Sequence, residues 1–538
     1  MRGALLLTLA FALPCPAAPL LDAAARQALE ALLPGAQPDA RATALLDIAQ
    51  AGDKRFIAPL VDTMRFVRGY DELRAAAATL QRLASPQAPA LDWAEMVVWV
   101  GRNPQWGTPP GYLGWKGRLH APIDPRLAEF LREGAKATMR VEEVQWGGVR
   151  VDGIPALVNP RVTPAAAAGW LKNGDAVFGV YLGGEARAYP LRILDWHEMA
   201  NDVVGGMPVA LAYCTLCGSG VLFDARAGKR RFEFGSSGFL FRSNKLMYDR
   251  QTKTLWNHLT GEPVIGELAG SGTRLTRLPV VITSWGEWRR QHPRTTVLSL
   301  DTGHQRPYDA GAAYGHYFAS TGTMFPVWQK SGALHGKARV FTLVLEGRAK
   351  AYALEALNDT GGVLNDELAG RALVVHYRDG VGRVPLTPRW GTKYANDLTI
   401  EAARAAIQAQ RGLLRELTAE MLLAMPTATR LTLLEEFTLD DRSGPLTPEI
   451  SIDAALRNEV ASRGLIGETR AYERGALRFS GQTRDALLDE QGRPWKVTEK
   501  ALVGPAGERL PRLAGELAYW FGWFAFFPQT EVYGGTAR

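Results

Sequence analysis

The chain has 538 residues, of which 46% are hydrophobic and 22% charged, and its formal net charge is +7. This composition is ordinary for a globular protein, so disorder is not expected, and the length indicates more than one domain. The basic residues form no long run and accompany no base-reading motif, so nucleic-acid binding is not expected.

The N-terminus has the pattern of a secretory signal peptide over residues 1–18. Arg2 supplies a positive charge, Ala4–Leu13 is a short apolar run, and the small residues of Cys15–Ala18 suit a cleavage site. The run is too short to span a bilayer, and so is the apolar segment Leu517–Pro528, which predicts a buried segment. We therefore expect a periplasmic or secreted protein with no membrane span after signal cleavage.

Residues 19–92 have the apolar spacing of amphipathic helices. Leu21, Ala25 and Leu29 recur at helical intervals, and a turn at Ala51–Asp53 separates later segments. This pattern predicts a helical unit of HEAT-like hairpins, and its expected role is to support the domain that follows.

A β-rich pattern begins after Val149, where short apolar runs alternate with Gly and Pro. We expect a first β-rich domain over residues 93–300, with strands at 176–182, 186–189, 209–214, 221–223, 231–234 and 245–248. A short helix is expected at Asp195–Val203. The predicted fold class is α+β, with the helical unit followed by two related β-rich domains.

The second β-rich domain, expected over residues 301–538, repeats the first. Asn201–Asp202 recurs as Asn365–Asp366, at a shift of 164 residues. Seven later residues recur at a shift of 235: Leu275/Leu510, Leu278/Leu513, Trp285/Trp520, Trp288/Trp523, Pro293/Pro528, Thr295/Thr530 and Val297/Val532. The shifts differ by 71 residues, which indicates a helical insertion at about 398–465 in the second copy. We therefore predict an internal duplication.

The repeat separates shared residues from residues that the first copy alone contains. The matched tryptophans are shared, which favours a structural role for them. Three chemically active residues of the first copy are replaced in the second: Cys214/Arg378, Cys217/Val381 and His197/Gly361. The residues that only the first copy contains are therefore the candidates for chemistry.

Cys214 and Cys217 form a Cys-x-x-Cys, and the third cysteine, Cys15, lies in the predicted signal peptide. Two such thiols can bind one metal ion, cycle between dithiol and disulfide, or form a structural disulfide. A thioredoxin-like site would place them at a helix N-terminus. Here Cys214 follows a predicted strand and no helical pattern begins at Gly218, which weakens the redox interpretation.

A metal site requires further ligands. His197 is the first candidate, because it lies just before the strand that ends at Cys214, and Asp195 or Glu198 is expected to orient its ring. Further ligand options are Met207, Met247 and His258. Thiolate, imidazole and thioether ligands suit copper, whereas two thiolates, a histidine and an open position also suit zinc.

The leading hypothesis is a copper or zinc site at Cys214, Cys217 and His197, with no activity assigned. The first alternative is a thiol–disulfide oxidoreductase in which Cys214 is the attacking thiol and Cys217 its partner. The second is a non-catalytic scaffold whose helical segments bind a partner, in which case the cysteines are dispensable. The partner would be a small molecule or another protein.

Several motifs follow one another along the first domain: Gly184–Leu191, His197–Glu198, Asn201–Asp202, Tyr213–Cys217, Phe234–Gly238, Met247–Arg250 and Leu255–Trp256. In this order they resemble an exported prokaryotic family, domain of unknown function 3179, over residues 150–300 and again over 301–395 and 470–535. The resemblance implies an extracytoplasmic location and a site at His197, Cys214 and Cys217, but no activity. The family usually has Pro after the first cysteine, where this chain has Thr215.

Overall fold

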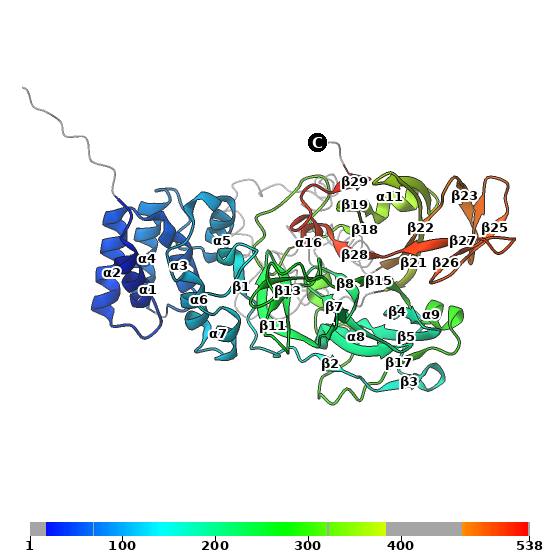
Figure 1. Cartoon of the computed structure of the whole chain (residues 1–538), viewed down its shortest axis with the longest axis horizontal. Coiled ribbons are helices and arrows are strands. Elements are labelled where there is room, and N and C mark those ends of the chain that lie inside the picture. Colours follow the sequence, from blue (N-terminus) through cyan, green and yellow to red (C-terminus); the bar gives the residue numbers. More distant parts are fainter. Residues whose placement is uncertain (1–17, 68, 320–321, 384–464, 536–538) are drawn as a thin grey trace, which may run out of the picture. The chain divides into compact units, whose positions relative to one another are not determined.

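The computed structural model describes residues 18–67, 69–319, 322–383 and 465–535 (Figure 1). The chain divides into two compact units, Met1–Gly134 and Ala135–Arg538. Residues 1–17 of the predicted signal peptide, and the predicted insertion up to residue 464, lie outside the described residues. Among the described helices, none combines the length and the apolar character needed to cross a membrane.

The first unit is helical, and its buried residues recur every three or four positions. On its first helix the buried face consists of Ala25, Ala28 and Leu29, which share one side. The second helix packs against the first and the fourth, and the third packs against the fifth. The helices are α1 (Asp22–Ala31), α2 (Pro38–Ala51), α3 (Ile57–Thr63), α4 (Tyr70–Leu83), α5 (Trp93–Arg102), α6 (Tyr112–His120) and α7 (Arg126–Phe130).

The helical unit continues to Gly134, whereas the sequence pattern placed its end at residue 92. The Trp-, Gly- and Pro-rich segment after residue 92 extends the unit because its polar groups start and anchor helices. The Asp92 carboxylate accepts the backbone N–H of Glu95 at 3.0 Å and so caps α5. The Trp115 indole donates to the Leu29 carbonyl at 2.6 Å, which ties α6 to α1. That these helices form HEAT-type repeats stays a prediction.

The first β-region, which we define as residues 135–300, contains three five-stranded sheets. The first sheet has the order β1 (Val144–Trp146), β11 (Phe234–Phe241), β12 (Asn244–Asp249), β13 (Leu255–Asn257) and β14 (Glu262–Ile265). The second has the order β15 (Arg277–Leu278), β8 (Ser219–Asp224), β7 (Met207–Cys214), β6 (Met199–Val204) and β2 (Leu157–Val158). The third has the order β16 (Val281–Ser284), β4 (Ala176–Leu182), β5 (Glu185–Pro190), β17 (Thr296–Leu298) and β3 (Val162–Pro164).

Two helices accompany these sheets, α8 (Leu191–His197) and α9 (Trp285–Gln291), and the pair β9 (Arg226–Ala227) and β10 (Arg230–Arg231) forms a small ribbon. The predicted strand at 176–182 matches β4. The helix predicted at Asp195–Val203 is wrong over most of its length. The helix ends at His197 because Glu198 adopts a φ of 53°, and the next residues form β6, which pairs with β7.

The second β-region, which we define as residues 339–535, contains two sheets in its described part. The smaller has the order β28 (Gly515–Tyr519), β18 (Arg339–Leu345), β19 (Arg348–Ala353) and β29 (Glu531–Tyr533). The larger has the order β20 (Val363–Leu368), β21 (Arg371–Arg383), β22 (Leu465–Glu473), β27 (Arg509–Leu513), β26 (Ala501–Val503), β25 (Pro494–Val497), β24 (Ala486–Asp489) and β23 (Phe479–Gln482). Its helices are α11 (Leu354–Asp359) and α16 (Trp520–Phe524), and α10 (Gly315–Ala319) lies between the two β-regions in the chain.

One sheet in each β-region has the same pairing pattern. β4 pairs antiparallel with β5 and β16, and β5 pairs parallel with β17. Likewise β18 pairs antiparallel with β19 and β28, and β19 pairs parallel with β29. In both, a tryptophan indole donates to a threonine hydroxyl, at 2.9 Å for Trp288 and Thr295 and at 3.1 Å for Trp523 and Thr530. That the two regions derive from one duplicated unit stays a prediction.

One hydrophobic cluster extends from the first β-region into the second. It contains Cys214 and Cys217 of the first together with Tyr519 and Phe521 of the second. The Cys-x-x-Cys therefore lies in the core of the second unit.

Candidate functional site

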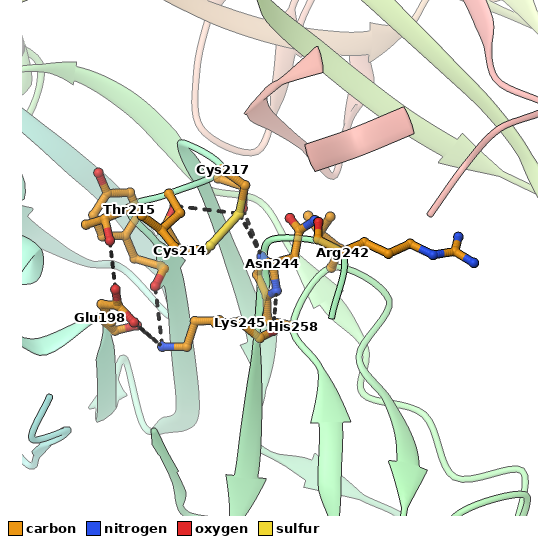
Figure 2. The surroundings of a disulfide bond; sticks show 12 residues. Glu198, Cys214, Thr215, Cys217, Arg242, Asn244, Lys245 and His258 are labelled. Carbon is orange, nitrogen blue, oxygen red and sulfur yellow. Dashed lines mark hydrogen bonds and ion pairs between the residues drawn. A yellow bond between two sulfur atoms is a disulfide. The ribbon is translucent and has the colours of Figure 1, made fainter. Parts of the chain in front are cut away.

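The two cysteines lie at a β-hairpin turn between β7 and β8 (Figure 2). Cys214 is the last residue of β7 and pairs with Ser219, the first residue of β8. The turn requires Gly218, whose φ of 58° lies in the left-handed region. The Cα atoms of Cys214 and Cys217 are 5.5 Å apart, and their sulfurs are at disulfide distance. The prediction that no helix begins at Gly218 is confirmed.

The third member of the group is His258, which directly follows β13. Its Nε2 lies 3.5 Å from Cys217 Sγ and 3.0 Å from Ser219 Oγ. One potential ligand atom from each of Cys214, Cys217 and His258 lies within 4.8 Å of the other two, and all three residues are buried. In the part of the chain that the structure describes, no other three His, Cys, Asp or Glu side chains are placed to hold a metal ion.

The proton position on His258 follows from its hydrogen bonds. Its Nδ1 lies 2.9 Å from the Lys245 backbone carbonyl, which can only accept, so Nδ1 carries the proton. Nε2 therefore presents a lone pair toward Cys217 and Ser219. Burial, with the nearby Lys245 charge, lowers the pKa of His258 to about 3, so the imidazole is neutral at ordinary pH.

Lys245, on β12, holds both sides of the group together. Its Nζ donates to the Glu198 carbonyl at 2.9 Å and to the Tyr213 carbonyl at 3.4 Å, just before Cys214. Its own carbonyl accepts the His258 proton. Burial lowers the pKa of the Lys245 ammonium, which the Glu198 carboxylate at 3.4 Å opposes. One buried residue therefore fixes the strand end and the imidazole.

Glu198 has a backbone conformation that is unusual for a residue other than glycine, with a φ of 53°. This conformation ends α8 and turns the buried side chain toward the cysteine turn. Its Oε1 accepts the Thr215 hydroxyl at 2.7 Å. Thr215 stands where the resembling family usually has Pro, and here its hydroxyl attaches the turn to Glu198.

The structure does not bring His197 into this group. Its Nδ1 lies 2.7 Å from the Pro155 carbonyl, and its Nε2 lies 2.6 Å from the Tyr308 hydroxyl. The Pro155 carbonyl, rather than Asp195 or Glu198, orients the ring. Burial lowers the pKa of His197 to about 4. Both ring nitrogens thus have partners that do not belong to the cysteine turn.

Of the further ligand options, the two methionines pack in apolar clusters and His258 joins the cysteines. Met247 packs with residues that include Trp256, and Met207 lies at the edge of the cluster that contains the cysteines.

The sequence contains a signal that could have singled out His258, because a nearby tryptophan is matched in the second β-region. A buried tryptophan donates to an aspartate in each region, in the pairs Trp256–Asp249 and Trp495–Asp489. Aligning the two tryptophans makes Val497 the counterpart of His258, so the histidine is found only in the first β-region.

A family model described as "Protein of unknown function (DUF3179)" matches residues 151–530. The chain belongs to the DUF3179 family. The match includes the three residues of the group, Cys214, Cys217 and His258, and begins after the helical unit ends. No curated protein and no solved structure gives a significant match to the chain.

The geometry of the buried group is compatible with two chemical states. As thiolates, Cys214 and Cys217 join the neutral His258 nitrogen in a soft donor set for a metal ion. As a disulfide, the sulfurs form an oxidised pair with no acidic proton. Because the same sulfurs are used in both states, the two states exclude each other.

Proposed function

We propose that this DUF3179 protein binds a metal ion, zinc or copper, between Cys214, Cys217 and His258 when the cysteines are reduced. The observation that carries the proposal is the direction of the His258 Nε2 lone pair, which faces Cys217 because Nδ1 donates to the Lys245 carbonyl. An imidazole oriented through its other nitrogen by a carbonyl is the usual arrangement of a histidine ligand.

The buried surroundings favour an ion that leaves the centre uncharged. Two thiolates and a neutral histidine are balanced by a divalent ion, whereas Cu⁺ would leave one negative charge. Lys245 supplies no compensation, because it is already paired with Glu198. Uncompensated buried charge is costly, so we expect zinc in preference to Cu⁺.

The Ser219 hydroxyl is placed to complete such a centre. It lies 3.2 Å from Cys217 Sγ and 3.0 Å from His258 Nε2. Structural zinc sites usually have four ligands, and the three side chains of the group provide three. Ser219 can donate to a thiolate or supply the remaining oxygen.

A second candidate function is a thiol–disulfide couple, which the disulfide distance between the sulfurs favours. In this reaction the Cys214–Cys217 disulfide takes up two electrons and two protons and becomes two thiols. His258 Nε2, 3.5 Å from Cys217 Sγ, is placed to accept a hydrogen bond from the Cys217 thiol of the reduced form.

We also propose an extracytoplasmic location and an origin of the two β-regions by duplication. The apolar run after Arg2 supports the location, as does a cysteine pair at disulfide distance, which suits an oxidising compartment. The matched strand pairings and the Trp288–Thr295 and Trp523–Thr530 hydrogen bonds support the duplication.

The test is elemental analysis of the full-length protein, purified without chelator, before and after treatment with a phosphine reductant and Zn²⁺. We expect about one ion per chain in the reduced protein, because the group forms one site. The Cys214→Ser/Cys217→Ser double variant should bind none while its circular dichroism and melting remain comparable.

Equal metal content in the double variant would contradict the metal centre. A reduced wild type that takes up no metal but shows a reversible two-electron couple would support the second candidate. If the protein shows neither metal binding nor a redox couple, the scaffold hypothesis remains, in which the helical segments are required and the cysteines are not.

A further inference from the structure

The cysteine turn is covered by the C-terminal part of the second β-region. Tyr519, the last residue of β28, donates its backbone N–H to the Cys217 carbonyl at 2.8 Å. The Tyr519 ring packs on Gly218, where a Cβ atom would lie 2.9 Å from the ring. α16 begins at the next residue and lies beside the turn, as the pale red ribbon in Figure 2 shows.

Gly522, inside α16, packs closely against Cys217. A Cβ atom at this position would lie 2.6 Å from Cys217 Cβ and 3.1 Å from Asn244 Oδ1. Gly522 is not among the residues with positive φ, so turn geometry does not require a glycine. Glycine inside a helix is unfavourable on its own, so the close packing over Cys217 explains its presence.

Polar contacts tie this covering segment to the first β-region. Arg277 on β15 donates to Glu516 on β28 at 2.6 Å. Arg242, at the turn between β11 and β12, donates to the Ala525 carbonyl at 2.6 Å. None of these contacts belongs to a strand pairing, so they can break without disrupting a sheet of either region.

The closed arrangement leaves buried polar atoms without partners. Among the described residues, Asn244 Oδ1 and Ser243 Oγ have no hydrogen-bond partner, although both residues are buried. The covering segment lies against one of them, because a Cβ atom at Gly522 would lie 3.1 Å from Asn244 Oδ1, and water would satisfy this atom if the segment moved away. Burying unpaired polar atoms opposes closure, which makes the closed state easier to leave than a fully paired interface.

We propose that the second β-region is the cover of the Cys214–Cys217–His258 group, and that the segment Tyr519–Ala525 separates from the cysteine turn to admit a metal ion or a reductant. The inference rests on the proposed function only for the identity of what enters. It gives a role to the region that lacks the cysteines, namely controlling access to those of the first.

The first test uses wild-type protein in the disulfide state and measures the rate of its reduction by dithiothreitol in increasing urea. We expect reduction at least about a hundredfold slower than in the unfolded chain, with a urea dependence well below that of global unfolding. Reduction at the unfolded rate would show that there is no cover. A urea dependence equal to that of global unfolding would show that the cover does not open by itself.

The second test compares Gly522→Ala with Gly336→Ala. A Cβ atom at Gly522 overlaps Cys217, whereas one at Gly336 would meet only Phe521 Cβ, at 4.0 Å. We expect Gly522→Ala to accelerate reduction roughly tenfold or more and Gly336→Ala to change it less than about twofold. Equal rates in wild type and both variants would overturn the proposal.

Two controls keep the outcomes separate. The melting temperatures of the variants distinguish opening of the cover from general unfolding, and the urea experiment on wild type decides the question if Gly522→Ala does not fold. Because both tests follow disulfide reduction, they can succeed where metal binding fails. If the protein binds metal but its disulfide is reduced at the rate of the unfolded chain, the proposal of a cover is wrong and the proposed metal site is unaffected.

Discussion

In the first β-region β7 ends at Cys214 and the chain turns back into β8, whereas in the second the matching strand β21 continues to Arg383. In the repeat, the residue that corresponds to Cys214 is Arg378. Its guanidinium donates to Glu468 at 2.6 Å and to Glu287 at 2.9 Å. The same kind of strand thus supports a cysteine turn in one region and buried ion pairs in the other.

The comparison shows which contacts the two β-regions share, and we call the strands and contacts found in both regions the frame. The hydrogen bond of Tyr189 to Asp202, at 2.7 Å, recurs between Tyr352 and Asp366, at 2.8 Å. These contacts persist whether or not a cysteine follows in the chain. The frame is therefore independent of the chemistry placed on it, and its two versions can be perturbed separately.

The largest expected effect is on zinc affinity, and it distinguishes the roles of His258 and His197, the two buried histidines of the first β-region. His258→Gln removes the imidazole that faces Cys217, so we expect zinc affinity of the reduced protein to fall more than about a hundredfold. His197→Gln should change affinity less than about threefold, because both ring nitrogens of His197 contact other groups. Competition with a chromogenic chelator measures both. A greater loss with His197→Gln would favour the ligand set inferred from sequence.

A smaller effect concerns Glu516, whose matched residue in the first β-region is Val281. Burial raises the pKa of Glu516 to about 7, although Arg277 lies 2.6 Å away and lowers it. The folded state thus binds the proton more tightly than the unfolded state. The stabilisation is fully present below the unfolded pKa of about 4.5 and is lost as pH rises through about 7.

We therefore expect the protein to lose up to about 3 kcal/mol of stability between pH 5 and pH 8 from this group. Glu516→Gln should remove that part of the pH dependence, and thermal unfolding at several pH values measures it. An unchanged slope in Glu516→Gln would mean that the carboxyl is not the titrating group.

The smallest expected effect tests whether the two regions share one frame. Trp288→Phe and Trp523→Phe each remove an indole N–H that donates to a threonine hydroxyl in a buried site. We expect each change to cost about 1–2 kcal/mol, measured by urea denaturation with hydrogen exchange to locate the loss. Effects that differ severalfold would show that the matched tryptophans do not have matched roles.

The frame could be predicted because its signals are local. The strand at Ala176–Leu182 has a continuous apolar pattern between turns, and its bounds were predicted correctly. Most of β6, up to Val203, was placed in a helix because the sequence does not reveal that Glu198 ends α8 in a left-handed conformation. A single backbone angle decided that error.

Only part of the site could be predicted, because its remaining contacts join distant positions. The two cysteines are only three positions apart in sequence and were found directly. His258 is 41 residues from Cys217 and directly follows β13, a strand of another sheet. His197 was chosen because it precedes β7 in the chain, but its ring contacts Pro155 and Tyr308. Chain proximity does not determine where a side chain points.

The position of the cover has a consequence for biosynthesis. The contact of Arg242 with Ala525 spans 283 residues, so the cysteine turn is synthesised long before the segment that closes over it. At usual rates of synthesis that interval is roughly 15–60 s. Incomplete chains therefore lack the segment that covers Cys214 and Cys217, and a pulse of maleimide should label the two thiols in incomplete chains but not in finished ones.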